Sequence, residues 1–246
     1  MANWSDPRPT AAPFGTTRAR AGDAAYDAGL RSYMLSVYNY MASGVLLTGI
    51  VALLFATSGY AEAVFTQPGI LKYVIMFSPL AIVFAMSFGQ GRMSTGTMQA
   101  MFWGFAVLMG LSLSTIFLQY SPVAIAQAFF ATSAGFVALS LYGYTTKKDL
   151  SAFGTFLIIG VVGLLVASVI NMFVQSGPLG MLISAVGVLL FAGLTAYDTQ
   201  RTKSLYAQVA GTDMQGKVVI MSALSLYLDF INMFLFILRL FGASRD

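Results

Sequence analysis

Two aspartates lie inside apolar stretches of the sequence, where an ionisable side chain calls for a reason. The chain has nine acidic residues, and seven of them fall in polar segments: Asp6, Asp23, Asp27, Glu62, Asp149, Asp213 and Asp246. The other two are Asp198 and Asp229. An ionised carboxylate at the centre of a bilayer costs about 3 kcal/mol, so acids within spans face the bundle interior or water and usually pair. We therefore expect Asp198 and Asp229 to carry the function.

Helical spacing places further polar residues beside both aspartates. Ser225 and Ser222 lie four and seven residues before Asp229, and Asn232 lies three residues after it. Positions three, four and seven apart share one face of a helix, so these residues predict a polar face. Thr195, three residues before Asp198, belongs to a similar stripe of small and polar side chains.

Two facing carboxylates predict chemistry with protons and cations. In a low-dielectric site both cannot ionise cheaply, so such a pair shares a proton. Ionised carboxylates are hard oxygen ligands of the kind that Ca²⁺ prefers, and in a pore they attract cations. Asp198 and Asp229 would then bind the metal ion, sense pH and gate a cation pathway. The alternative is a structural role in which each aspartate caps or hydrogen-bonds a neighbouring helix.

The residue types that are missing exclude several functions. The chain has no Cys and no His, which excludes disulfides, thiolate metal sites, Cys nucleophiles, imidazole bases and haem ligation by His. The net charge is +4, but the basic residues lie in separate short segments and form no continuous patch. We expect no tightly bound cofactor and no nucleic acid partner.

Composition indicates that the positioning elements are membrane-spanning helices. Of 246 residues, 58% are hydrophobic and only 9% are charged, more apolar surface than a water-soluble globule could bury. The sequence therefore predicts an all-α integral membrane protein with the lipid bilayer as its solvent. Seven segments are long enough to cross a bilayer: Tyr33–Ala56, Leu71–Phe88, Met98–Leu118, Pro122–Tyr142, Phe153–Val174, Leu179–Tyr197 and Val218–Leu240.

Charge distribution predicts the orientation of these spans. Residues 1–29, with several prolines and arginines, are interpreted as a disordered cytoplasmic tail, and residues 30–246 as the seven-helix transmembrane domain. This arrangement puts ten basic residues on the cytoplasmic side and three, Lys72, Arg239 and Arg245, on the other. The excess predicts a cytoplasmic N-terminus. A re-entrant or half-membrane last helix is the alternative to a seventh crossing, because it would keep Arg239 and Arg245 inside.

Six segments of the sequence resemble the Bax inhibitor family of membrane proteins, in its bacterial branch. They are GLRSYMLSVYNYM (29–41), FGQGRMS (88–94), GLSLSTIF (110–117), YGYTTKKDLS (142–151), FAGLTAYDTQ (191–200) and LSLYLDFINMFLFILRLFG (224–242). The resemblance implies a seven-helix bundle with a central C-terminal helix, acting in the bacterial inner membrane as a pH-sensitive Ca²⁺ leak channel.

The family's two pore aspartates are similar in motif to Asp198 in AYDTQ and Asp229 in LYLDFIN. Some members are described as closing this pair with an arginine of the second helix. Here Leu71–Phe88 contains no arginine, and Arg92 just beyond it is the candidate for such a latch.

Two other functions fit parts of this sequence pattern. Intramembrane aspartyl proteases also place an aspartate after a tyrosine, as in Tyr197 and Asp198, but their Gly-x-Gly-Asp motif is absent, since Asp229 follows Leu-Tyr-Leu. We therefore expect no enzymatic activity. The remaining alternative is a non-transporting regulator that binds another membrane protein, such as a membrane protease, because helix surfaces can bind partners without a sequence motif.

Overall fold

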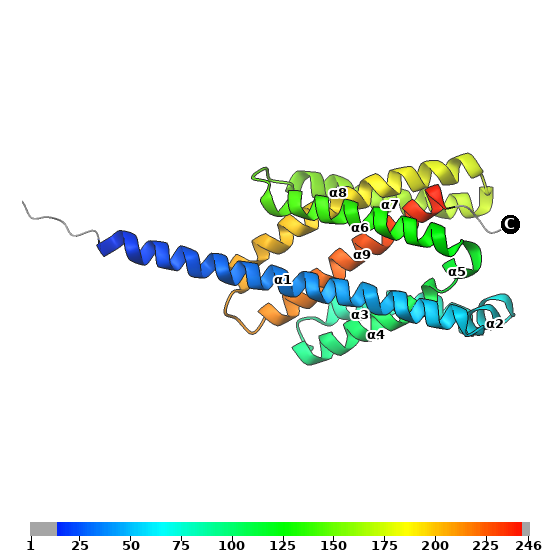
Figure 1. Cartoon of the computed structure of the whole chain (residues 1–246), viewed down its shortest axis with the longest axis horizontal. Coiled ribbons are helices and arrows are strands. Elements are labelled where there is room, and N and C mark those ends of the chain that lie inside the picture. Colours follow the sequence, from blue (N-terminus) through cyan, green and yellow to red (C-terminus); the bar gives the residue numbers. More distant parts are fainter. Residues whose placement is uncertain (1–13, 243–246) are drawn as a thin grey trace, which may run out of the picture.

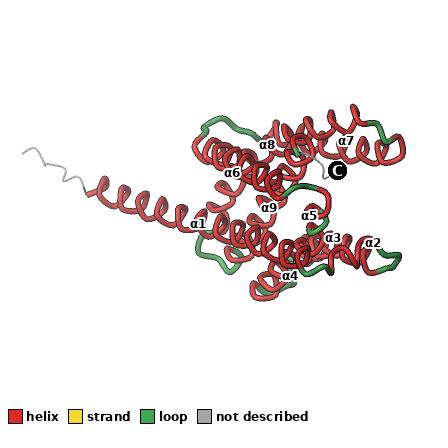
Figure 2. Tube along the Cα trace, turned by 45° about the vertical axis from the view of Figure 1, so that its right-hand side comes forward, coloured by secondary structure: helices red, strands yellow, loops and turns green. Residues whose placement is uncertain are grey.

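Residues 14–242, which the computed structural model describes, fold into a helical bundle without strands (Figure 1). The helices are α1 (Phe14–Thr57), α2 (Tyr60–Thr66), α3 (Leu71–Gly89), α4 (Thr95–Leu113), α5 (Ile116–Gln119), α6 (Pro122–Thr145), α7 (Ser151–Val174), α8 (Gly177–Val209) and α9 (Gln215–Phe241). The predicted all-α class is confirmed. Loops gather at the two ends of the bundle, as Figure 2 shows.

Within residues 14–242, seven segments are long and apolar enough to cross a membrane, which confirms the predicted number of spans. Each predicted span lies within one of the long helices, except the third, which α4 and the short α5 share. α9 is continuous over 27 residues and ends at the side of the bundle opposite to the start of α1 (Figure 1). The last helix is thus long enough for a full crossing.

α9 occupies the centre of the bundle. It runs diagonally between α1 and α4 on one side and α6 and α8 on the other, and packs against all four (Figure 1). Of the seven spans, α9 is the most deeply buried and α7 the most exposed. The predicted central C-terminal helix is confirmed, and residues on α9 are screened from lipid by its neighbours.

Serine residues begin three of the spans. The hydroxyls of Ser94, Ser121 and Ser176 accept the backbone N–H three residues on, at the starts of α4, α6 and α8. A side-chain acceptor at this position satisfies one of the N–H groups that a helix start leaves unpaired. Proline follows Ser121 directly in the first turn of α6, where its missing N–H costs nothing.

Two helices are longer than the sequence predicts. α1 begins at Phe14, so Phe14–Gly29 of the predicted disordered tail is helical, and residues 1–13 of that tail lie outside the described residues. α8 continues for twelve residues beyond Tyr197, the predicted end of the sixth span, through a stretch that contains many polar side chains. The two extensions meet, because the ring of Tyr206 on α8 packs against Tyr26 and Tyr33 of α1 at centroid distances of 5.2 and 5.3 Å.

Candidate functional site

The two intramembrane aspartates lie on the two helices that pack most extensively, α8 and α9. Asp198 is only 8% exposed and Asp229 only 4%. Both lie on faces turned toward the bundle interior, where Ser184, Gly187, Phe191 and Thr195 of α8 and Ser222 of α9 are also buried. The carboxylates are therefore kept away from lipid.

The antiparallel packing of α8 against α9 brings the two carboxylates together. The Ser225 side chain, one turn before Asp229, faces Asp198, and the two aspartates lie close enough for their charges to interact. The Oδ2 atom of Asp229 is buried and has no hydrogen-bond partner. A buried carboxylate oxygen without a donor is a costly arrangement in a packed interior, and such groups call for a functional reason.

A cation that the sequence analysis did not single out lies on the same helix as Asp198. Arg201, one turn after Asp198 on α8, is the basic residue whose charge acts on that carboxylate. Arg92 is exposed in the loop between α3 and α4, and in the described part of the chain it forms no ion pair. A latch through Arg92 stays a prediction. The three-residue spacing between Asp198 and Arg201 was the signal that sequence reasoning missed.

The other predicted polar residues divide between the pair and their own helices. Ser225 faces Asp198 across the contact between α9 and α8. Thr195 donates to the Phe191 carbonyl at 2.8 Å, and Asn232 donates to the Leu228 carbonyl at 2.8 Å, both within their helices. Ser222 faces the buried Tyr33 hydroxyl of α1, which has no partner in good hydrogen-bond geometry.

A chain of hydroxyl groups fixes α9 two residues before Asp229. The buried Tyr227 hydroxyl pairs with Thr48 Oγ1 of α1 at 2.7 Å, and Thr48 Oγ1 donates to the Ala106 carbonyl of α4 at 2.8 Å. These two hydrogen bonds connect α1, α4 and α9 close to Asp229. Sequence reasoning did not find this network.

α8 is fixed on the other side of Asp198. Gln200 accepts the Leu150 N–H at 2.9 Å and donates to the Lys148 carbonyl at 2.8 Å, which attaches the loop between α6 and α7 to α8. In that loop, outside the spans, hydrogen bonds from Ser151 hold the pKa of the exposed Asp149 carboxyl below its usual range. The turn of α8 that carries Asp198 is thus anchored at its exposed side.

The pair can offer only part of a metal-ion coordination shell. Among the described residues, no three acidic side chains gather in one place. Ca²⁺ takes about six to eight oxygen ligands, so two carboxylates and the Ser225 hydroxyl leave water and carbonyl groups to supply the others.

Comparison with known proteins shows to which family this seven-helix bundle belongs. Residues 30–246 match the family model described as inhibitor of apoptosis-promoting Bax1. The chain belongs to the Bax inhibitor family. This match begins one residue past Gly29, where the predicted tail ends, and includes both aspartates.

Bacterial members of the Bax inhibitor family align with nearly the whole chain. An uncharacterised protein of Rickettsia prowazekii is 46% identical over 222 residues, which cover 90% of this chain and 93% of that protein. The inner membrane protein YbhL of Escherichia coli is 42% identical over 221 residues, covering 89% of this chain and 94% of YbhL. An uncharacterised protein of Caulobacter vibrioides is 41% identical over 240 residues, covering 93% and 95%. This chain is accordingly an integral membrane protein of that family.

Proposed function

We propose that this protein is a cation leak channel, for Ca²⁺ in particular, in which Asp198 and Asp229 form the gate and sense pH. The observation that carries the proposal is the burial of two acids on helices α8 and α9, which pack against each other, with Asp229 Oδ2 left without a donor. Acids inside membrane-spanning helices mark ion and proton pathways. A merely structural aspartate would be expected to use all of its acceptors.

Protonation is the proposed switch. A pair that shares one proton carries a single negative charge and can be satisfied within a closed bundle. When that proton leaves, the two charges repel each other and attract a cation, which favours an opened and hydrated path between α8 and α9. Flux should therefore fall as the pH is lowered. Protons and Ca²⁺ are the partners of this site, and no catalytic step or bound cofactor is involved.

We further propose a location in the bacterial inner membrane with the N-terminus in the cytoplasm. The relative YbhL is named as an inner membrane protein, which supports the compartment. The excess of basic residues on the side of the N-terminus supports the orientation. On this orientation, Asp198 lies toward the cytoplasmic side of Asp229 along the proposed path.

The experiment is Ca²⁺ influx into liposomes that contain the purified protein and an entrapped Ca²⁺ indicator. Influx is recorded from about pH 5 to 8, the range that a coupled carboxylate pair can cover. We compare the natural chain with Asp198→Asn and Asp229→Asn, and with Asp213→Asn as a control, since Asp213 is exposed in the loop before α9. The natural chain and the control should share one pH profile, and both span variants should lose it.

Flux that never exceeds that of empty liposomes would refute the channel. The regulator that binds another membrane protein would then become the leading function. If both span variants kept the pH profile of the natural chain, the protein would still be a channel, but its gate would not be this pair of aspartates.

A further inference from the structure

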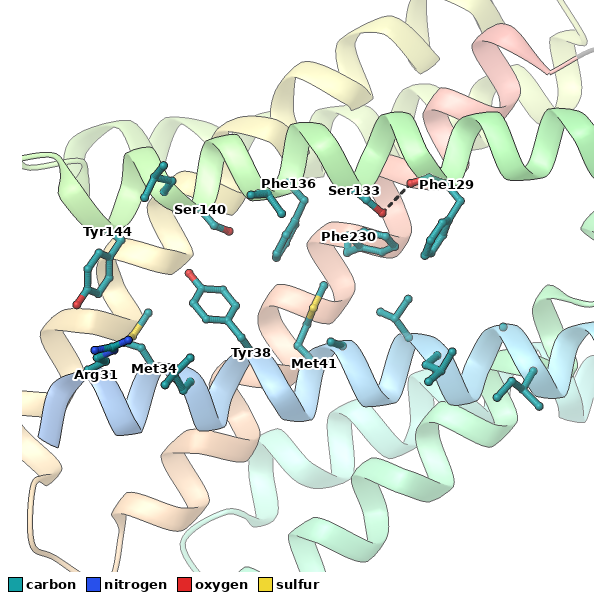
Figure 3. A pocket seen from close by; sticks show the side chains of 18 of the residues that line it. Arg31, Met34, Tyr38, Met41, Phe129, Ser133, Phe136, Ser140, Tyr144 and Phe230 are labelled. Atoms are coloured by element: carbon teal, nitrogen blue, oxygen red, sulfur yellow. Dashed lines mark hydrogen bonds between the residues drawn. The ribbon is translucent and has the colours of Figure 1, made fainter. Parts of the chain in front are cut away.

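A deep groove separates α1 from α6 on a lateral face of the bundle (Figure 3). Its volume is about 850 Å³, within the range of about 300 to 1,000 Å³ found for sites that enclose small molecules. Its floor is formed by buried side chains of three helices: Met34, Met41 and Val45 of α1, Phe136 of α6 and Phe230 of α9. Its rims are exposed aliphatic side chains of α1 and α6.

The polarity of this groove changes along its length. On α1 its lining runs from Arg31 to Leu53, which at 1.5 Å per residue is about 33 Å, the thickness of a bilayer. Arg31, Tyr38, Ser140 and Tyr144 lie together at one end, and Figure 3 shows Arg31 and Tyr144 facing each other from the two walls. Ser133 lies farther along the groove, and its hydroxyl donates a hydrogen bond of 2.8 Å to the Phe129 carbonyl of its own helix.

Positive charge is concentrated at the polar end. The Arg31 side chain is exposed, and it forms no ion pair with an acid in the described part of the chain. Lys203 of α8 lies behind Tyr144, donating to its carbonyl at 2.8 Å with its ammonium 4.8 Å from the ring centroid. A guanidinium group next to a tyrosine hydroxyl at the mouth of an apolar channel, with a second cation behind that tyrosine, matches a phosphate attached to hydrocarbon chains.

We propose that the groove between α1 and α6 is a specific binding site for an anionic phospholipid. The phosphate lies against Arg31 and the Tyr144 hydroxyl, and an acyl chain follows the groove over Met41 toward Phe230. A partner helix or a second copy of the chain would fit less well, because either would have to cover the arginine at the polar end with a matching acid. A zwitterionic phospholipid carries the same phosphate, but its ammonium group offsets the charge of that phosphate, so Arg31 should favour an anionic lipid.

The site touches the helices that carry the aspartates. Phe230, on its floor, directly follows Asp229 in the chain, and Ser140 on its wall accepts a hydrogen bond of 3.4 Å from Thr199, the residue after Asp198. A bound acyl chain thus packs on both α9 and the contact between α6 and α8. The proposal itself concerns lipid binding and stands whether or not the protein conducts ions.

The test is native mass spectrometry of the purified full chain, titrated with phosphatidylglycerol or with phosphatidylcholine of the same acyl chains. The natural chain should retain one phosphatidylglycerol with an affinity about tenfold above that for phosphatidylcholine, as expected for a charge-assisted contact. Arg31→Gln should abolish the preference, and Lys147→Gln, which removes an exposed cation of the loop before α7, should keep it.

A second pair of variants tests the groove itself. A side chain at Gly49 would enter open space on the groove wall, so Gly49→Phe should occupy it and reduce retention of both lipids. Gly163→Phe is the control, since Gly163 of α7 also faces open space but lies outside the groove. Equal retention of both lipids by the natural chain, retention in Gly49→Phe at the level of the natural chain, or a dimer that Gly49→Phe disrupts would each overturn the proposal.

Discussion

At the scale of single residues, two hydrogen bonds hold α9 in place: Tyr227 to Thr48, and Thr48 to the Ala106 carbonyl. Substitutions can test how much each contributes. Tyr227→Phe removes the first of these bonds and should lower the free energy of unfolding by about 1 kcal/mol, since Thr48 keeps its bond to Ala106. Thr48→Val should cost more, about 1 to 3 kcal/mol, because it leaves the Tyr227 hydroxyl buried without a partner. Thermal unfolding in detergent, followed by circular dichroism, measures both changes.

The exposed tyrosine at position 60 supplies the control for these variants. Tyr60 is 66% exposed, so Tyr60→Phe should leave the unfolding temperature unchanged. If Thr48→Val were as stable as the natural chain, the hydroxyl chain would contribute nothing to the position of α9.

Single residues differ in how far sequence reasoning could find them. Asp198 and Asp229 were found because an acid within an apolar segment has no ordinary explanation. The contact between Thr48 and Tyr227 could not be found, because its partners are 179 positions apart and each is unremarkable alone. Arg92 was chosen by analogy and stays a prediction, whereas Arg201, three residues after Asp198 on the same helix, could have been found from its spacing.

At the scale of helices, Gly143 sets the contact of α6 with α8. A Cβ atom at this position would meet the backbone carbonyl of Ala196, two residues before Asp198, and backbone cannot move aside cheaply. Gly143→Ala should therefore push the two helices apart, with a loss of about 1 to 3 kcal/mol of stability from overpacking. It should also alter Ca²⁺ flux, because the displaced turn carries Asp198.

Gly135 provides a matched control on the same helix. A Cβ there would have nothing within 4 Å, so Gly135→Ala should be neutral or should stabilise α6 slightly through the better helix propensity of alanine. The two glycine variants are compared by their unfolding temperatures and by their Ca²⁺ flux in liposomes. Equal effects of the two substitutions would show that helix propensity, and not the approach of α6 to α8, determines the outcome.

Helix positions were predictable because hydropathy alone determines which segments enter lipid. Helix ends were not, because hydropathy falls where the chain leaves the membrane even if the helix continues. The end of α8 beyond Tyr197 reads as a polar loop, yet it stays helical and packs Tyr206 against Tyr26 and Tyr33 of α1. That contact depends on two helices far apart in the sequence.

At the scale of the whole molecule, the exterior is apolar and the interior holds the polar pair. α7 is the least buried span, and its exposed side includes Phe156, Ile159 and Phe173, as suits a surface solvated by lipid. The groove between α1 and α6 has no counterpart in the sequence pattern, because it arises from the separation of two helices that both pack on α9. A seven-helix bundle could be predicted, but its lateral opening could not.

The arrangement of seven spans predicts which loops share a side of the membrane. The chain has no Cys, so single cysteines can be introduced one at a time and labelled with a membrane-impermeant maleimide. Glu62→Cys, exposed on α2, should be labelled in intact spheroplasts, and Lys147→Cys, exposed in the loop before α7, only after lysis. This difference follows from an N-terminus held inside by its basic residues. The reverse labelling pattern would show that the chain has the opposite orientation. Arg31 and its proposed lipid would then lie in the outer leaflet, and Asp198 would lie toward the periplasm.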